Sequence, residues 1–290
     1  MSDIRVIMCQ PAIKRFQWEL EVSITRLHKI GVRDIVLLFT KKDPSVPSYL
    51  KNKYGVEIHC YDDKRRDRNY IPSVKPYLWA KFLQEDRTRE NETYLYIDSD
   101  VLVNSIPNVQ STTDTWYASD CESYLGIEYI ESKGLDILKR MSEIVGIDYE
   151  ILKKENPYGG AQWVITHPTY EYWLKVYDDS IRLYRYLNSV PNTDIQKWTA
   201  EMWAQLWNTY LFNKTVVADH SEMKFTWATD PITYYDKTNF YHNAGVVNDK
   251  QGLFFKGKYI TNTPFEDDLD FVDPTKASLR YVEAIREVVV

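Results

Sequence analysis

The sequence predicts an α/β fold in which helices flank a mainly parallel sheet. Three observations support this prediction. Strand-like and helix-like patterns alternate through the first hundred residues, and the strand-like runs are almost entirely apolar, as in strands that helices cover on both faces. The chain has 290 residues and 44% hydrophobic content, which is enough for one large domain with a sizeable core. Such an alternating order connects parallel strands through right-handed crossovers.

Glycines mark the ends of two helices in the first half. Apolar residues recur at steps of three and four from Phe16 to Ile30, which predicts an amphipathic helix that ends at Gly31, and Gly55 ends a shorter helix in the same way. The predicted elements are strands at residues 4–9, 34–40 and 56–61, helices at residues 16–30, 46–54 and 74–84, and a fourth strand that carries Asp98. The first strand is not followed by a glycine-rich dinucleotide loop, and the sequence has no Walker loop, which disfavours dinucleotide oxidoreductases and P-loop proteins.

The pattern is less regular in the second half. It predicts strands at residues 116–119 and 161–166, helices at residues 133–145, 170–187, 193–212 and 276–289, and short strands before the last helix. Neither a low-complexity linker nor an internal repeat interrupts the sequence. We therefore expect a single domain over residues 1–290 that ends in a small C-terminal α/β extension.

Composition bears on the location of the protein and on its partners. A formal net charge of −6 gives no global footprint for nucleic acid, although a local basic patch could still bind phosphate. The three cysteines, Cys9, Cys60 and Cys121, are widely spaced, so buried thiols in a reducing compartment are expected rather than a disulfide framework or a zinc site. The N-terminus lacks the apolar region of a signal peptide, and no run approaches the roughly 20 apolar residues of a membrane helix. We expect a cytoplasmic protein without membrane insertion.

The most informative stretch is residues 94–103, where an apolar strand-like run ends in Asp98 and Asp100. Alternation along an extended strand would place both carboxylates on the same side. Hard oxygen donors at the end of a strand suit Mg²⁺ or Mn²⁺ that carries a substrate diphosphate, and ligands of such sheets bind beyond the carboxyl ends of the strands. The competing interpretation is a turn or a helix cap, in which short acids accept backbone hydrogen bonds.

The Asp-Ser-Asp at residues 98–100 resembles the DxD motif of glycosyltransferases with the GT-A fold, which hold a nucleotide-sugar through a divalent metal. The resemblance implies a Rossmann-like GT-A sheet, with a nucleotide-binding half at about residues 1–105 and a half at about residues 106–290 that binds the acceptor and completes the site. It implies that Asp100 binds the metal directly and that Asp98 binds the metal or the ribose. Many such enzymes lie behind a membrane anchor in the secretory pathway, so a chain without one is expected in a bacterium or a virus-infected cell, including infection by a phage.

The His-Asn-Ala-Gly at residues 242–245 is similar to the His-x-x-Gly element of family 8 glycosyltransferases, in which a following lysine grips the diphosphate. It implies that His242 is the third metal ligand and that Lys256 or Lys258 binds the diphosphate. The sequence departs from family 8, because the lysine comes later and the usual Pro-Trp after it is absent. The similarity to that family is therefore distant, and the choice between the two lysines stays open.

Two further segments provide candidates for the sugar and for the acceptor. The Gly159-Gly160 pair resembles the glycine-containing segment that lines the donor-sugar pocket of GT-A enzymes, where glycine permits positive φ and close approach of the backbone, and Gln162 could reach sugar hydroxyls. A plain turn before a strand is the alternative. Glu201, in a predicted helix, could orient or deprotonate the acceptor, although a solvated helix acid is the more frequent case for such a glutamate. If the enzyme inverts, a carboxylate such as Glu201 or Asp194 must take the acceptor proton.

Basic and aromatic residues supply the remaining candidates. The resemblance to GT-A enzymes implies that Arg66, in the basic run of residues 64–69, and Lys75 lie near the nucleotide, where a basic side chain could meet its phosphates. The alternatives are that the run is a solvated loop or that it contacts an anionic acceptor such as DNA. Nine Trp and 23 Tyr suit a carbohydrate site but must mostly be core. The tryptophans closest in sequence to the predicted site are Trp79, Trp163 and Trp203.

Together these residues imply metal-dependent transfer of a sugar from a nucleoside diphosphate sugar, with UDP favoured, to an acceptor hydroxyl. The His-x-x-Gly similarity slightly favours retention of anomeric configuration. The acceptor stays open among a glycan, a small molecule, a protein and a hydroxymethylated base in phage DNA. The alternatives are a nucleotidyltransferase acting on sugar phosphates, whose glycine-rich N-terminal loop is absent here, and a non-catalytic protein of the same fold that binds a sugar or a partner.

Overall fold

The computed structural model describes residues 4–248 and 251–289. The backbone contacts divide the chain into two compact units. Unit 1 comprises Met1–Arg5, Tyr61–Tyr96 and Val109–His220, and unit 2 comprises Val6–Cys60, Ile97–Asn108 and Ser221–Val290. The expectation of one domain over residues 1–290, with halves that meet near residue 105, stays a prediction.

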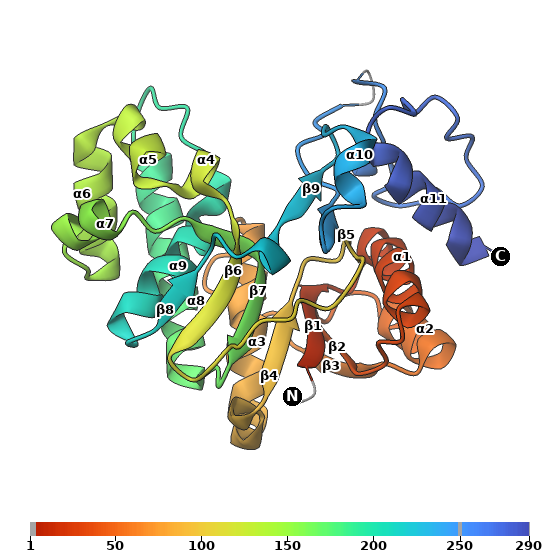
Figure 1. Cartoon of the computed structure of the whole chain (residues 1–290). Helices are drawn as coiled ribbons and strands as arrows, with labels where there is room; N and C mark the ends of the chain where they lie inside the picture. The colour runs from red at the N-terminus through yellow and green to blue at the C-terminus, as the bar shows by residue number, and fades with distance from the viewer. Residues whose placement is uncertain (1–3, 249–250, 290) are drawn as a thin grey trace. The chain divides into compact units, whose positions relative to one another are not determined.

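Unit 2 contains the first two βα repeats of the chain and its C-terminal helix (Figure 1). Its strands and helices, two of the strands reaching slightly past the unit boundary, are β1 (Ile4–Pro11), α1 (Lys14–Lys29), β2 (Ile35–Thr40), α2 (Ser45–Tyr54), β3 (Glu57–Tyr61), β5 (Val101–Val103), β9 (Phe225–Trp227), α10 (Ile232–Tyr235), β10 (Phe240–His242) and α11 (Ser278–Val289). Strands β1 and β2 are parallel, and every residue of β2 is buried. The predicted helix ends are confirmed, because Gly31 and Gly55 follow α1 and α2 with φ of 87° and 70°.

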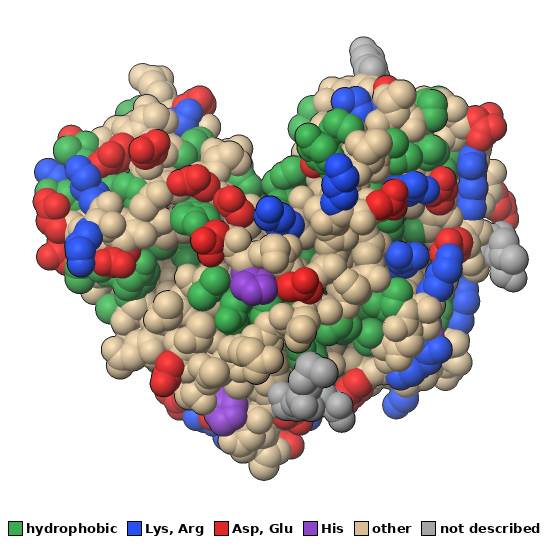
Figure 2. Space-filling view, in the orientation of Figure 1, with side chains coloured by type: hydrophobic (Ala, Val, Ile, Leu, Met, Phe, Trp, Pro, Cys, Tyr) green, Lys and Arg blue, Asp and Glu red, His purple; other side chains and the backbone are tan. Residues whose placement is uncertain are grey.

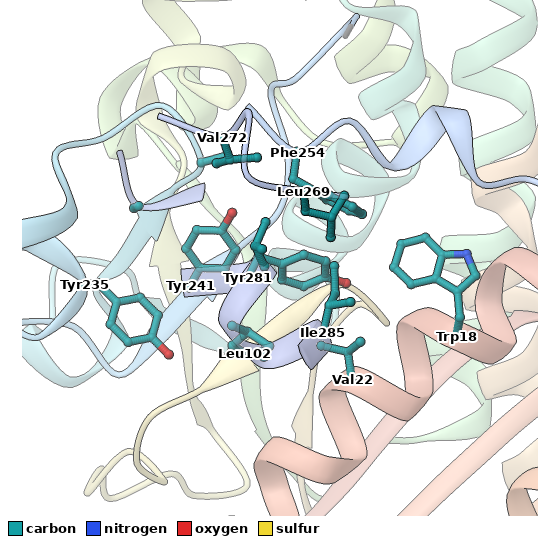
Figure 3. Close-up of a cluster of buried hydrophobic side chains, with 14 of the residues drawn as sticks. Trp18, Val22, Leu102, Tyr235, Tyr241, Phe254, Leu269, Val272, Tyr281 and Ile285 are labelled. Carbon is teal, nitrogen blue, oxygen red and sulfur yellow. The ribbon is translucent and has the colours of Figure 1, made fainter. Parts of the chain in front are cut away.

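A hydrophobic cluster of unit 2 lies between α1, α11 and the small sheet that contains β5 and β10. Trp18 and Val22 on α1 face Tyr281 and Ile285 on α11, and Leu102 of β5 packs beneath them (Figure 3). The Trp18 indole N–H donates to the backbone oxygen of Tyr259 at 2.9 Å, so the polar edge of this buried ring is satisfied. This packing fixes α1 against β5, the strand that directly follows Asp98 and Asp100 in the sequence.

Unit 1 contains the remaining strands and most of the helices. Its elements are α3 (Val74–Glu85), β4 (Thr93–Tyr96), β6 (Thr115–Asp120), α4 (Glu122–Leu125), α5 (Ile127–Lys133), α6 (Leu135–Val145), α7 (Tyr149–Glu155), β7 (Gly159–Thr166), α8 (Tyr170–Ser189), α9 (Ala200–Leu211) and β8 (Thr215–Val217). The tryptophans closest in sequence to the predicted site are core residues, as expected for most of the aromatic side chains, since Trp79, Trp163 and Trp203 are at most 2% exposed. Trp79 stacks on Trp173 of α8 with ring centroids 4.8 Å apart.

The predicted α/β class is confirmed. A seven-stranded, mostly parallel sheet has the order β3-β2-β1-β4-β7-β6-β8, and a three-stranded sheet has the order β5-β10-β9. The sequence did not reveal the direction of β7, which runs antiparallel to both β4 and β6.

Two predicted helix starts are wrong for local reasons. Gly134, with φ of 136°, separates α5 from α6, so the helix predicted at residues 133–145 begins at Leu135. The helix predicted at residues 193–212 begins at Ala200, because the preceding chain makes other hydrogen bonds: the Gln196 N–H donates to the Tyr129 hydroxyl. Helices α4, α5 and α7 were not predicted as separate elements.

Charges of both signs are interspersed on the side of unit 2 that carries α1, α2 and α11. Lys, Arg, Asp and Glu side chains lie among one another there, as expected for solvated helix faces (Figure 2). None of the helices within residues 4–248 and 251–289 is both long and apolar enough to cross a membrane.

Candidate functional site

Asp98 and Asp100 lie in a turn between β4 and β5. The Ile97 N–H still donates to the Ile7 oxygen at 3.2 Å, but the Val101 N–H then turns back to donate to the Asp98 oxygen at 3.3 Å. The prediction that strand alternation aligns the two carboxylates is therefore wrong, because the backbone is no longer extended at Ser99 and Asp100.

Pairing of β10 with β5 brings a histidine from far along the chain to these acids. The two strands are antiparallel, and His242 lies opposite Val101, the residue directly after Asp100. The next residue extends the contact, since the Asn243 N–H donates to the backbone oxygen of Asp100 at 3.1 Å. The register of one short strand pair thus sets the position of the imidazole relative to the acids.

The three side chains form a compact donor set. Ligand atoms of Asp98, Asp100 and His242 all lie within 4.8 Å of one another, the one group of its kind in the part of the chain that the structure describes. His242 Nε2 is 3.9 Å from Asp98 Oδ2 and 3.5 Å from Asp100 Oδ1. An octahedral ion with bonds of ~2.1 Å has neighbouring ligand atoms about 3 Å apart and opposite ones about 4 Å apart. The spacing and the oxygen-rich donors therefore fit Mn²⁺ or Mg²⁺.

Exposure and charge distinguish the two acids. The Asp98 side chain is 32% exposed, whereas that of Asp100 is 5% exposed and contacts the ammonium group of Lys256. Burial by itself would raise the pKa of Asp100, but the nearby Lys256 and His242 outweigh it and hold that pKa well below its usual range. Asp100 is therefore a fixed negative charge and the more buried of the two acids.

The structure separates the two candidate lysines. Lys256 reaches Asp100, whereas Lys258 lies 3.4 Å from Asp267 with its side chain 54% exposed. The Lys258 ammonium also lies 5.5 Å from the ring centroid of Tyr259. Only Lys256, of these two, contacts the donor set.

Sequence reasoning missed a buried carboxylate beside the acids. Glu19 of α1 accepts hydrogen bonds from the Ser99 hydroxyl at 2.6 Å and from Arg15 Nε at 2.8 Å. Its side chain is 1% exposed, so burial raises its pKa, and repulsion from Asp100 adds to the effect. The signal available in the sequence was a glutamate among the apolar residues of an amphipathic helix, four residues after an arginine.

An aromatic ring that was also missed stacks on the histidine. The Trp227 ring lies nearly parallel to the His242 ring, at 9° with centroids 6.0 Å apart. Trp227 ends β9, which pairs with β10 so that the two residues are opposite each other. This contact restricts the orientation of the imidazole.

Known structures share this fold, although no protein-family model and no curated protein matches the sequence. WbbM, a bifunctional glycosyltransferase, matches with a TM-score of 0.54 and 11% identity over 98% of this chain and 50% of WbbM. The galactosyltransferase LgtC, in complex with donor and acceptor sugar analogues, matches with a TM-score of 0.51 and 12% identity over 97% of this chain and 95% of LgtC. The chain has the GT-A fold. It spans about half the length of WbbM, and its similarity to family 8 glycosyltransferases is only distant.

Unit 1 of this GT-A chain pairs two of the predicted site residues with each other. Lys75 Nζ lies 2.6 Å from Glu201 Oε1, and their side chains are 21% and 4% exposed. The Glu201 N–H donates to the Tyr70 hydroxyl at 2.7 Å, and that hydroxyl donates to the Trp198 oxygen at 2.8 Å. Glu201 is therefore not a solvated helix acid. Its assignment as a base and that of Lys75 as a phosphate ligand stay predictions.

We expect the variant Lys75→Met to lose about 3–5 kcal/mol in its free energy of unfolding, because it leaves the Glu201 charge buried without this partner. Urea unfolding would measure the loss. The double variant Lys75→Met with Glu201→Leu should recover most of it, since no buried charge is left. The matched control is Lys133→Met, whose partner Asp194 is 82% exposed and stays hydrated. A Lys75→Met protein as stable as this control would contradict the expectation.

The glycine pair has a packing role that differs from the predicted one. Both glycines lie in β7 without positive φ, which occurs instead at Ala161 with 56°. A Cβ on Gly160 would lie 2.7 Å from Leu125 Cδ1 and 2.9 Å from Met202 Cε, and one on Gly159 would lie 2.9 Å from a methyl of Val216. Close packing within unit 1 therefore requires glycine here, and a donor-sugar role for this pair stays a prediction.

The other candidates of unit 1 lie in different environments. Gln162 of β7 is fully buried. Asp194 is exposed and 2.9 Å from Lys133, which lowers its pKa, while Arg66 contacts Asp178 and lies over the Tyr177 ring. Their roles in sugar transfer or nucleotide binding stay predictions.

Proposed function

We propose that the protein is a metal-dependent glycosyltransferase that moves a sugar from a nucleoside diphosphate sugar to an acceptor hydroxyl. The observation that supports this most is the group of Asp98, Asp100 and His242 within 4.8 Å in a chain with the GT-A fold. The structural similarity to LgtC, whose structure contains donor and acceptor sugar analogues, supports the proposal. We favour UDP as the nucleotide, and a glycan or a hydroxymethylated DNA base as the acceptor.

The donor set suits Mn²⁺ or Mg²⁺, held by Asp98, Asp100 and His242. When bound, the ion supplies positive charge to the donor phosphates, where negative charge grows as the sugar leaves. Lys256 adds a second positive charge on the side of Asp100. Trp227 keeps the imidazole plane in place, and Glu19 holds the turn through Ser99. Asp98, Asp100, His242 and Lys256 would thus act together to bind and stabilise the departing diphosphate.

We infer that transfer proceeds with retention, in which the protein need not supply a strong base. Glu201 lies 2.6 Å from Lys75, and an ion-paired carboxylate is a weak base. Asp194 is exposed and has a lowered pKa, which also makes it a weak base. NMR of the product formed from an α-linked donor would give the stereochemistry, and a β-linked product would contradict retention.

A thermal-shift screen of nucleoside diphosphates, with and without Mn²⁺, tests the proposed function. A ligand that binds only the native state adds about 2.7 kcal/mol at 100 times its Kd. We expect uridine diphosphate to raise Tm by several degrees with Mn²⁺ and by much less with the chelator EDTA. A protein that responds to no nucleoside diphosphate or nucleotide-sugar under any divalent ion would refute the proposal.

A further inference from the structure

Arg15 lies at the start of α1 in an electrostatically unfavourable position. The first turn of this helix has no acidic residue, and its N-cap, Ile13, offers no side-chain acceptor. The N-terminal end of a helix carries a partial positive charge, which disfavours a cation there. An arginine in this place needs compensation by negative charge from outside the first turn.

Glu19 supplies part of that compensation and fixes the arginine. Arg15 Nε donates to Glu19 Oε1, and the other Glu19 oxygen accepts from Ser99, the residue between the two acids of the donor set. Because Glu19 is almost fully buried, its carboxylate has little freedom to move. Arg15 is thereby connected through one side chain to the turn that carries Asp98 and Asp100.

The guanidinium keeps capacity for another anion. It has five N–H donors, and within residues 4–248 and 251–289 its hydrogen bonding is through Nε alone. The Arg15 side chain is 26% exposed, so solvent and ligands can reach it. Burial lowers its pKa, but attraction to Glu19 and to the Asp100 carboxylate outweighs burial and raises that pKa. The hydrogen bonds from Arg15 to Glu19 and from Ser99 to Glu19 connect the cation to the turn of the donor set.

We propose that Arg15 is a second cation of the donor site, which binds the diphosphate of the nucleotide-sugar through its terminal amino groups while Glu19 holds it in place. The inference rests on the proposed function. A planar guanidinium can bind two phosphate oxygens at once, whereas Lys256 provides a point charge. Such a second cation would offset the negative charge that Asp98, Asp100 and Glu19 place beside a diphosphate.

Calorimetric binding to the full-length protein with Mn²⁺ tests the proposal. The variant Arg15→Gln should bind the nucleoside diphosphate about 10–100-fold more weakly, as expected for loss of charge-assisted hydrogen bonds. Its affinities for Mn²⁺ alone and for the unphosphorylated nucleoside should stay within about twofold of the wild type. The matched control is Lys14→Gln, which removes a charge from the same helical turn, where the Lys14 ammonium lies 3.5 Å from Gln17 Oε1, and this variant should bind the diphosphate as the wild type does.

A second variant is needed because Arg15→Gln leaves Glu19 without this cation and could misfold for that reason. Arg15→Lys keeps a positive charge but cannot bind two oxygens, and it should weaken diphosphate binding by about threefold or more. Wild-type diphosphate affinity in both variants would overturn the role of Arg15, as would an equal loss of nucleoside and Mn²⁺ binding. A wild-type protein that binds no nucleoside diphosphate with Mn²⁺ would overturn the proposed function itself.

Discussion

Replacement of Asp100 by asparagine should abolish metal-dependent transfer. The side chain is almost fully buried, one oxygen lies 3.5 Å from His242 Nε2, and the other contacts Lys256. Asparagine has nearly the same shape but no negative charge, so it neither holds a divalent ion well nor balances Lys256. We expect kcat/KM to fall by about 10³-fold or more, beyond the 10–100-fold typical for residues that only support a metal ligand. Steady-state transfer assays and Mn²⁺ titration would measure both effects.

The matched control is Asp270→Asn, which removes a carboxylate that is 81% exposed and pairs with Arg286 in the same unit. This variant should keep the activity of the wild type. Circular dichroism and thermal unfolding should show that Asp100→Asn is folded, so that lost activity reports on the site. If Asp100→Asn transferred sugar at the wild-type rate, Asp100 would not be a metal ligand and the proposed mechanism would fail.

Local signals predicted much of the fold. Gly31 and Gly55 end their helices with positive φ, and the apolar run of β2 is buried throughout, because helix termination and strand burial depend on neighbouring residues. The direction of β7 could not be read in this way. It is defined by antiparallel pairing with β4 and β6, and the partner residues in β6 lie about 40 residues or more away along the chain.

The candidate site was predictable to a similar extent. Asp98 and Asp100 follow an apolar run, and His242 lies in a segment similar to a known family element, so these residues could be named in advance. The short distance between His242 and the two acids could not be predicted, since it depends on the register of β5 against β10. The contact of Glu19 with the site could not be predicted, because a helix pattern shows only which face of the helix a residue lies on. It does not show that Glu19 accepts a hydrogen bond from the Ser99 hydroxyl.

Replacement of Lys256 should lower activity far more than replacement of Lys258, although the sequence alone did not distinguish the two lysines. We expect Lys256→Gln to lower kcat/KM by about 10²–10³-fold, the loss that follows removal of one group that stabilises developing negative charge. Lys258→Gln removes the same charge two residues later, from a side chain that is 54% exposed and pairs with Asp267. It should stay within about twofold of the wild type, because exposed ion pairs contribute little.

An alternative explanation is that Lys256 only neutralises the charge of Asp100. The variant Lys256→Gln distinguishes this explanation from stabilisation of the departing diphosphate. If neutralisation were its only role, Lys256→Gln would bind Mn²⁺ at least as tightly as the wild type, because the ion would no longer compete with the ammonium, and transfer would persist at saturating Mn²⁺. If Lys256 stabilises the departing diphosphate, kcat falls even when Mn²⁺ and donor are saturating, since the lost interaction belongs to the transition state. We expect the second result, because the Lys256 side chain is 23% exposed beside Asp100 and so can reach a ligand bound there.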